Sequence, residues 1–311
     1  MEKRVVIITG PTGSGKSELA FLLAKTLGTE IIVADSRQIY KELVIGSAQP
    51  SKDKQQQIRY HLLSSLNLSE NFNAARFEAL SDSIIGSLLG ENKIPVIEGG
   101  AGLYLRALIG GIVEIPGETD VYRRELNDLL LREGREFVYN LLCEEDPETA
   151  KTLLPQNYKR VIRALEVKRA TGKSIQWFFS HQEVKRSYDS LQFGLLRERD
   201  DLYRRINERV DKMIDAGLVE EVKGILSVGY DAGINPLNTV GYKEIIAFLR
   251  GEFELDTAIE LIKRNSRHYA KRQMTWFRKQ PGIEWCSITN DDGYNKIVEK
   301  IIKKIQKPNE R

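Results

Sequence analysis

GPTGSGKS at residues 10–17 decides the fold of this chain, because a Gly-x-x-x-x-Gly-Lys-Ser segment between a strand and a helix is a phosphate-binding loop. The apolar run Val5–Ile8 precedes it, and a helical pattern of apolar residues follows it. Such a loop turns its backbone N–H groups toward phosphates, directs Lys16 to the outer phosphates and offers the Ser17 hydroxyl to Mg²⁺. The segment therefore predicts a phosphate ligand, but it does not by itself indicate a kinase.

The first hundred residues alternate between apolar strands and amphipathic helices. Continuous apolar runs predict strands at Val5–Thr9, Ile31–Ala34 and Ile94–Ile97, and the helical patterns lie at Lys16–Leu27 and Ala74–Leu89. Strands without polar alternation that are separated by helices form a parallel sheet with both faces covered. We therefore predict an α/β fold, in which a parallel sheet that carries the phosphate loop (a P-loop sheet) is flanked by helices.

From about Thr119 to His181 the pattern changes to charged amphipathic helices without strands. Leu191–Leu196 then predicts a strand that returns to the sheet, so the helical stretch is an insertion rather than a second domain in series. We predict a core of residues 1–117 and 190–311 and an inserted all-helical domain of residues 118–189. The elements expected after the insertion are helices at Asp200–Ala216, Val240–Leu249 and Leu255–Arg278, a strand at Glu284–Ile288 and a basic C-terminal helix.

The composition narrows the classes of protein. A formal charge of only +3 over 311 residues means that any nucleic-acid surface must be a local patch. Cys143 and Cys286 lie far apart in the sequence, which argues against a disulfide framework or a cysteine zinc site. The first strand begins within a few residues of the N-terminus, and no apolar run approaches the roughly 20 residues that span a bilayer. We therefore expect a soluble cytoplasmic protein without a membrane partner.

Polar residues follow two of the predicted strands, at the edge of a parallel sheet where ligands bind. Asp35-Ser36-Arg37-Gln38 follows the second strand, and Glu98-Gly99-Gly100-Ala101-Gly102 follows the third. For Asp35 two interpretations stay open: it is the N-cap of the next helix or supports a Mg²⁺ ion without binding it directly, or it acts as a general base beside the phosphates. The third strand ends in Glu-Gly-Gly instead of the Asp that holds Mg²⁺ in nucleoside triphosphatases, which argues against a kinase.

Seven segments between residues 10 and 278 resemble, in order, the motif blocks of the tRNA dimethylallyltransferases (tRNA isopentenyltransferases): GPTGSGKS, ADSRQIYKELVIGSAQPS, IPVIEGGAGLYLRAL, KRVIRALEVKRATGKS, LYRRINERVDKMIDAGLVEEV, NTVGYKEI and YAKRQMTWFRK. The resemblance implies transfer of the dimethylallyl group of dimethylallyl diphosphate to N6 of the adenosine on the 3′ side of the anticodon, in tRNAs that read U-starting codons. It implies Mg²⁺ as cofactor and the tRNA anticodon stem-loop as partner, and we expect a monomer.

The resemblance assigns the phosphate loop to the leaving diphosphate. An allylic diphosphate leaves with carbocation-like character, so catalysis depends on stabilising the departing charge. Asp35, in the family's Asp-Ser motif, would accept a hydrogen bond from N6 and take its proton. Arg205 matches a family position for diphosphate contact, although it could also be an exposed helix arginine. The implied diphosphate ligands are Gly10, Pro11, Thr12, Gly13, Ser14, Gly15, Lys16, Ser17 and Arg205, with Ser17 also on Mg²⁺.

Basic segments and family positions together predict the tRNA surface. Residues 261–280 combine seven Lys and Arg residues with Tyr269, Trp276 and Phe277 and contain no acid, a pattern typical of RNA binding, although the aromatic residues could instead anchor the core. We expect the cleft between the two domains to bind the stem-loop, while Arg163 could instead brace the insertion. The predicted tRNA-binding residues are Asp35, Ser36, Arg37, Gln38, Ala101, Arg123, Lys159, Arg160, Val161, Ile162, Arg163, Gly241, Tyr242, Lys243, Arg267, Lys271 and Arg272.

Two positions depart from the family pattern. Ala101 stands where the family usually has Thr or Ser, a hydroxyl thought to approach the reacting adenosine, and the block His61-Leu62-Leu63-Ser64 more often ends in Asp. Loss of one positioned hydrogen bond costs about 1–3 kcal/mol, which slows a reaction without abolishing it. Two alternatives to the transferase are a P-loop small-molecule kinase and an RNA-binding ATPase, both of which predict turnover of a nucleoside triphosphate.

Overall fold

The computed structural model describes residues 3–112, 115–116, 119–181, 186–289 and 293–307. The chain divides into two compact units: Met1–Gly110 with Arg186–Arg311, here called the sheet unit, and Gly111–Lys185, the inserted unit. The boundary predicted between residues 117 and 118 lies outside the described residues. At the return, strand β5 begins at Asp189, one residue inside the segment predicted to be the insertion, because Asp189 already pairs with Arg4 of the first strand.

The sheet unit contains one six-stranded sheet in which every pairing is parallel, as predicted. The strand order is β3-β2-β4-β1-β5-β6, so β1 lies in the interior of the sheet between β4 and β5. Its residue Ile8 pairs with Glu98 on one side and Phe193 on the other. The phosphate loop, which follows β1, therefore leaves the middle of the carboxyl edge. The strands are β1 (Arg4–Thr9), β2 (Ile31–Val33), β3 (Tyr60–His61), β4 (Val96–Gly99), β5 (Asp189–Leu196) and β6 (Ile283–Ser287).

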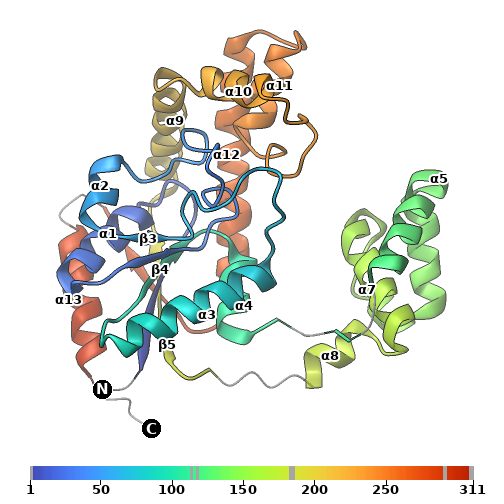
Figure 1. Cartoon of the computed structure of the whole chain (residues 1–311), viewed down its shortest axis with the longest axis horizontal. Coiled ribbons are helices and arrows are strands. Elements are labelled where there is room, and N and C mark those ends of the chain that lie inside the picture. The colour runs from blue at the N-terminus through green and yellow to red at the C-terminus, as the bar shows by residue number, and fades with distance from the viewer. Residues whose placement is uncertain (1–2, 113–114, 117–118, 182–185, 290–292, 308–311) are drawn as a thin grey trace. The chain divides into compact units, whose positions relative to one another are not determined.

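Helices cover both faces of this sheet (Figure 1). On one face, apolar side chains of α1 and α13 pack with Val6 and Ile8 of β1 in a single core cluster. Helices α3 and α4 lie on the opposite face, where Leu105 and Phe277 approach Ile7. The helices of this unit are α1 (Lys16–Leu27), α2 (Lys52–Gln57), α3 (Ala74–Gly90), α4 (Gly102–Gly110), α9 (Arg199–Asp215), α10 (Leu218–Ser227), α11 (Tyr242–Leu249), α12 (Leu255–Phe277) and α13 (Gly293–Gln306).

In the inserted unit the described residues form helices joined by turns and no strand, as predicted. Its core is built mainly by α5 and α7, where Leu126 and Leu142 of α5 pack with Val161 and Leu165 of α7. Gly134 interrupts α5 with a backbone φ of +84°. The elements are α5 (Thr119–Glu145), α6 (Pro147–Ala150), a 3₁₀ turn at Pro155–Asn157, α7 (Tyr158–Thr171) and α8 (Ile175–His181).

None of the helices formed by the described residues of either unit is long and apolar enough to cross a membrane.

Candidate active site

The phosphate loop has the backbone that its glycines permit. Gly13 and Gly15 have positive φ angles of +82° and +96°, a region that favours glycine. A Cβ atom on Gly15 would lie 2.0 Å from the hydroxyl oxygen of Tyr294, so no larger residue fits there. Helix α1 begins directly afterwards, at Lys16. Its first turn leaves backbone N–H groups without intrahelical partners beside the positive end of the helix dipole, which is a ready site for an anion.

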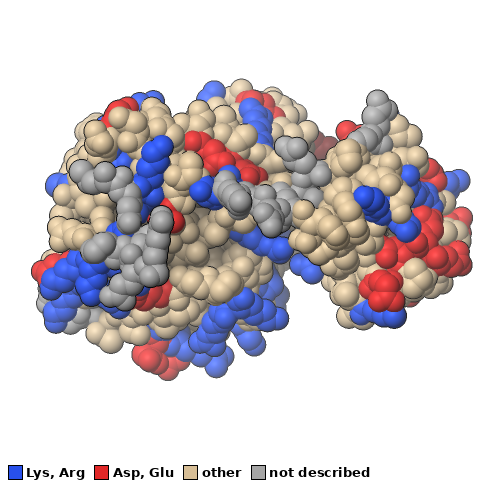
Figure 2. Space-filling view, turned by 90° about the horizontal axis from the view of Figure 1, so that it is seen from below, with Lys and Arg blue, Asp and Glu red and all other residues tan. Residues whose placement is uncertain are grey.

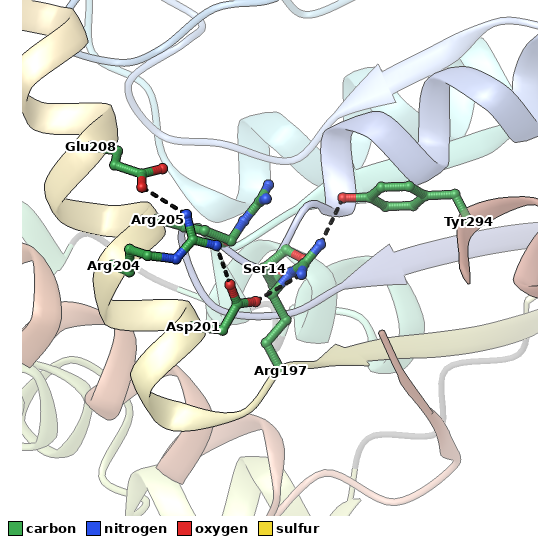
Figure 3. Close-up of polar contacts among 8 residues, drawn as sticks. Ser14, Arg197, Asp201, Arg204, Arg205, Glu208 and Tyr294 are labelled. Carbon is green, nitrogen blue, oxygen red and sulfur yellow. Dashed lines mark hydrogen bonds and ion pairs between the residues drawn. The ribbon is translucent and has the colours of Figure 1, made fainter. Parts of the chain in front are cut away.

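Three arginines bind oxygens of three successive loop residues from the side of α9. Arg209 donates to Thr12 Oγ1 (3.0 Å), Arg205 to the Gly13 carbonyl (3.1 Å) and Arg197 to the Ser14 carbonyl (2.9 Å). Figure 3 shows Arg197 and Arg205 at the loop. Arg197 also forms an ion pair with Asp201 (2.8 Å) and donates a hydrogen bond to the Tyr294 hydroxyl (3.1 Å). These hydrogen bonds turn the oxygens of the loop toward the arginines and hold the loop in shape without a ligand.

A cavity of about 350 Å³ lies beside this loop. It brings together the loop residues Lys16 and Ser17 with Asp35, although these segments are separated in sequence. This juxtaposition was predicted from the carboxyl-edge rule for parallel sheets. The cavity is lined by Thr12, Lys16, Ser17, Asp35, Ser36, Arg37, Gln38, Gly46, Ser47, Ala48, Glu98, Ile206, Arg209, Val210, Met213, Thr239, Val240, Gly241, Ile262, Ser266, Tyr269 and Gln273.

Arg209, rather than Arg205, is the α9 arginine that lines the cavity. Burial lowers the pKa of Arg209, and the charges of Asp35 and Glu98 act in the opposite direction. An arginine nonetheless keeps its charge at neutral pH. The sequence prediction named Arg205 and missed Arg209, which lies one helical turn later on the same face of α9. That i,i+4 spacing is the signal that could have identified it.

Glu98 is a second residue that the prediction missed. It ends β4 with only 2 % of its surface exposed, and the Ser17 hydroxyl donates to its Oε1 atom (2.8 Å). Burial raises the pKa of Glu98, while Lys16 opposes that shift; burial lowers the pKa of Lys16, while Glu98 opposes it. The Oε2 atom of Glu98 is buried and has no hydrogen-bond partner among the described residues. The acid at the end of a buried strand was visible in the sequence, where we interpreted it only as a missing Asp.

Asp35 forms a turn with one of its two oxygens, and it is not the N-cap of a helix, because the next helix, α2, begins only at Lys52. Its Oδ1 atom accepts hydrogen bonds from the backbone N–H groups of Arg37 (2.8 Å) and Gln38 (3.3 Å), the pattern of an Asx turn. The same residue lines the cavity, and no described residue donates to its Oδ2 atom in the structure. The turn therefore fixes the carboxylate without occupying both oxygens.

The predicted base-contacting residues beside Asp35 also line the cavity. Gln38 is 7 % exposed, and its Nε2 atom donates to the carbonyls of Ser47 (3.1 Å) and Ala48 (3.2 Å). Its Oε1 atom is buried without a partner among the residues that the structure describes. Ser36 and Arg37 are half-buried. Gln38 thus lines the cavity and carries an acceptor atom that no described residue satisfies.

The predicted tRNA residues on α12 differ in their surroundings. Lys271 and Arg272 are exposed, and the Arg272 guanidinium lies 5.7 Å from the centre of the Tyr269 ring. Arg267 donates to Asn207 of α9 (2.7 Å), so it also joins two helices. Phe277 is buried, which favours the core interpretation for that residue. Across the face shown in Figure 2, basic side chains alternate with acidic ones, as a net charge near zero would suggest.

Of four further predicted tRNA positions, only Gly241 lines the cavity. Gly241 lines it with φ +100°, and its N–H donates to Glu244 (2.8 Å). Tyr242 is fully buried and donates to Glu221 (2.7 Å), so its side chain packs in the core, while the contact between this turn and tRNA stays a prediction. Lys243 is exposed. Ala101 does not line the cavity; its carbonyl accepts from the N–H of Tyr104 (2.9 Å), which places it at the cap of α4.

In the inserted unit, α7 divides its predicted residues between surface and core. Lys159 and Arg160 are exposed. Arg123 and Arg163 both donate to Oε1 of Glu166 (2.8 and 3.1 Å), a carboxylate that is 1 % exposed. The bond from Arg123 braces α5 against α7, whereas Arg163 and Glu166 lie on the same helix, α7. The predicted tRNA contact by the side chains of Val161 and Ile162 needs correction. Both side chains lie in the core of the unit and offer RNA no surface.

Comparison with known proteins decides the family. The model of the IPP transferase family matches residues 38–280, more than half of the chain. The chain belongs to the IPP transferase family. It is 42% identical over 307 residues to the tRNA dimethylallyltransferase of Alkaliphilus oremlandii, covering 97% of each chain. It is 47% identical over 288 residues to tRNA dimethylallyltransferase 1 of Trichlorobacter lovleyi, covering 92% of this chain and 94% of that one.

Solved structures agree with this family assignment. The chain matches the tRNA isopentenylpyrophosphate transferase of Bacillus halodurans with a TM-score of 0.72 and 35% identity. The match covers 98% of this chain and 97% of the other. It matches a eukaryotic dimethylallyltransferase acting on tRNA with a TM-score of 0.83 and 26% identity, over 100% and 81%. The predicted family, α/β fold and prenyl-transferring enzyme class are confirmed, and neither the kinase nor the ATPase alternative finds support.

Proposed function

We propose that this chain transfers the dimethylallyl group of dimethylallyl diphosphate to N6 of the adenosine 3′-adjacent to the anticodon, in tRNAs that read U-starting codons. The products are N6-(dimethylallyl)adenosine and diphosphate. One observation carries the proposal: a single cavity is lined both by Lys16 and Ser17 of the phosphate loop and by Asp35. A donor diphosphate held by the loop would thus present its allyl group to a base held near Asp35.

The loop and its neighbours stabilise the leaving group. Backbone N–H groups at the start of α1 and the ammonium of Lys16 bind the diphosphate, and Arg209 supplies a second cation on the cavity wall. As the allylic C–O bond breaks, its electron pair leaves with the diphosphate, so these fixed positive groups act where negative charge develops. Arg205, bonded to the Gly13 carbonyl, acts by holding the loop in shape.

The residues at the loop fit a Mg²⁺ ion. Mg²⁺ prefers oxygen ligands and in phosphate sites takes one or two carboxylates or hydroxyls together with phosphate oxygens and water. The Ser17 hydroxyl and the Glu98 carboxylate offer such oxygens, and Glu98 Oε2 is buried without a described partner. Ser17 and Glu98 would hold the ion, and when bound it would neutralise charge on the diphosphate.

Asp35 acts as the base toward the acceptor. The exocyclic amine of adenine is a weak nucleophile, so the new C–N bond forms as its N6 proton moves to the carboxylate. The Asx turn holds Oδ1, and Oδ2 accepts the proton. Gln38, with an unsatisfied Oε1 atom on the same wall, accepts a second hydrogen bond from the base.

The acceptor is the anticodon stem-loop, whose target adenosine must leave the stack before its N6 can be reached. Exposed cations on α12 (Lys271 and Arg272) and on α7 (Lys159 and Arg160) neutralise RNA phosphates. We place the enzyme in the cytoplasm as a monomer. Two cysteines far apart in the sequence and the family's tRNA chemistry support that location.

The direct test combines the purified chain, Mg²⁺, dimethylallyl diphosphate and an adenosine-containing stem-loop, followed by digestion and mass spectrometry of the nucleosides. We expect one dimethylallyl group on the adenosine, and none when Asp35→Ala replaces the wild type. A parallel reaction supplies ATP instead of the allyl donor. Absence of the adduct across tRNAs that read U-starting codons, with phosphate released from ATP, would refute the proposal.

The RNA surface is tested by Lys159→Ala with Arg160→Ala. We expect weaker stem-loop binding and a shallower slope of log affinity against log salt concentration. The slope should fall by about one to two, because each phosphate contact contributes roughly 0.7–0.9 to it. Lys151→Ala is the matched control, since Lys151 is an exposed lysine of the same unit that already pairs with Glu148. Equal slopes in all three proteins, measured by binding titrations at several salt concentrations, would exclude this patch.

A further inference from the structure

Gln273 is the residue of α12 that reaches the phosphate loop. It lies among the cations of this helix, yet it is 8 % exposed. Its Oε1 atom accepts a hydrogen bond from the N–H of Thr12 (2.8 Å), and its Nε2 atom donates to the carbonyl of Gly100 (2.9 Å). One side-chain amide therefore joins two loops that follow different strands.

These two loops belong to the two halves of the proposed reaction. Thr12 lies in the phosphate loop, which would hold the donor. Gly100 follows β4, and the next residue, Ala101, donates its N–H to the carbonyl of Ala34 (3.3 Å), directly before Asp35. The Gln273 amide thus connects the donor loop to the sheet edge that carries the base.

The fit of the amide is specific in shape and in hydrogen-bond direction. A Cβ atom on Gly100 would lie 2.4 Å from Gln273 Nε2, so the contact depends on that glycine. The Thr12 N–H requires an acceptor and the Gly100 carbonyl requires a donor. A primary amide satisfies both at once, and because both partners are fixed backbone groups, it sets the distance between the two loops.

The helix that carries Gln273 also faces the cavity and the solvent. Ser266 and Tyr269 line the cavity and lie on the same face of α12 as Gln273, at spacings of three and four residues. Lys271 and Arg272, which flank this face, are exposed to solvent. The helix predicted to contact RNA is therefore bonded directly to the loop predicted to hold the donor.

We propose that Gln273 is a positioning residue for the transfer step, which aligns the donor diphosphate with the base by tying the phosphate loop to the loop after β4. The proposal rests on the proposed function. The positioning role goes beyond the proposed function, because it assigns the alignment of the two reactants to a residue outside the phosphate loop and outside the Asp-Ser motif. A displacement of about 1 Å between reacting groups can reduce a rate about 100-fold, so loss of this tie should appear in the chemical step.

The first test compares Gln273→Met with Gln280→Met. Methionine fills a similar volume without the amide. Gln280 is a matched control, because among the described residues its Nε2 atom donates only to the nearby carbonyl of Trp276 (3.3 Å). With saturating dimethylallyl diphosphate and stem-loop, we expect the single-turnover rate of Gln273→Met to fall about 100-fold. Donor affinity, measured calorimetrically without RNA, should stay within about threefold, because the loop amides and Lys16 remain.

The second test is the pH dependence of the rate of Gln273→Glu. A residue that only packs would not change this dependence. A protonated glutamic acid can donate to the Gly100 carbonyl and accept from the Thr12 N–H, whereas the ionised form loses the donor and repels that carbonyl. The rate of Gln273→Glu divided by the wild-type rate should therefore rise at least about tenfold from pH 8 to pH 5.5. Division by the wild-type rate removes the pH effects that the two proteins share.

The outcomes separate this inference from the proposed function. No product from the wild-type chain would refute the function itself. Product from the wild type, with equal single-turnover rates in Gln273→Met and Gln280→Met, would overturn the positioning role. So would a ratio for Gln273→Glu that does not change with pH, or a loss in Gln273→Met that appears only as weaker donor or RNA binding.

Discussion

Two buried carboxylates, Glu166 of the inserted unit and Glu98 of the sheet unit, have opposite surroundings. In the inserted unit, Glu166 is 1 % exposed and accepts from two arginines, Arg123 and Arg163. In the sheet unit, Glu98 is 2 % exposed, yet its Oε2 atom has no partner among the described residues. A buried polar atom without a partner costs free energy, so such atoms persist where a ligand satisfies them. The difference distinguishes a brace, which is complete in the protein alone, from a binding site.

Among the substitutions that test this contrast, the largest effect should follow from Lys16→Met. This substitution removes a cation from the cavity wall where the diphosphate charge develops, and loss of one such group lowers a rate about 1,000-fold. Multiple-turnover assays with mass spectrometry of the nucleosides would measure it. The stem-loop affinity should not change, and an enzyme that keeps more than about a tenth of its rate would place the diphosphate elsewhere.

Glu166→Gln should destabilise only the inserted unit. Breaking a buried ion pair costs about 3–5 kcal/mol, but both arginines here are more than a third exposed, so solvent screening reduces the expected loss to about 2 kcal/mol. Hydrogen exchange of α5 and α7 would report this loss. Equal changes in β1 and α1 of the sheet unit would contradict a local brace.

Glu98→Gln should weaken Mg²⁺ binding rather than the fold. We expect the Mg²⁺ concentration for half-maximal rate to rise about tenfold, because a charged ligand becomes neutral. Burial raises the pKa of Glu98 above its ordinary value of 4.5, so its contribution to stability is present below that value and is lost as pH rises through the raised pKa. The variant should therefore show a smaller decline of melting temperature between pH 4.5 and neutrality than the wild type. Identical pH profiles would show that Glu98 is ionised without penalty.

Ala101→Ser should produce the smallest effect, and it separates two roles of a hydroxyl. Ala101 occupies the cap position of α4, where serine stabilises a helix by about 0.5–1 kcal/mol relative to alanine. Ala101 does not line the cavity, so we expect a higher melting temperature with a rate within about threefold of the wild type. A rate increase larger than tenfold would instead support a hydroxyl that acts on the adenosine.

The sequence predicted those parts of the molecule that depend on local chemistry. The bounds of α1 match the prediction of Lys16–Leu27, because a glycine-rich loop before the helix and Gly28 after it act within one turn. Strand β4 was predicted two residues too early, at Ile94–Ile97, because the apolar run begins before the pairing with β1, which extends through Gly99. Strand β3 was missed because it has only two residues.

Roles set by long-range packing were not predictable from local pattern. Arg209 and Gln273 act through contacts with Thr12, which lies far away in the sequence. Val161, Ile162 and Tyr242 belong to motif segments, but adjacency in a motif does not decide whether a side chain faces the solvent or the core. The cavity-lining Asp35, by contrast, was predictable because it ends a buried parallel strand.

The most direct test of the central claim is the single-turnover rate of Asp35→Asn with saturating donor and stem-loop. Asparagine keeps an oxygen for the Asx turn, so the loop should retain its shape, while the base is lost. We predict a rate about 100- to 10,000-fold lower with unchanged donor affinity. A rate within about threefold of the wild type would contradict the claim that this cavity joins donor and base at Asp35.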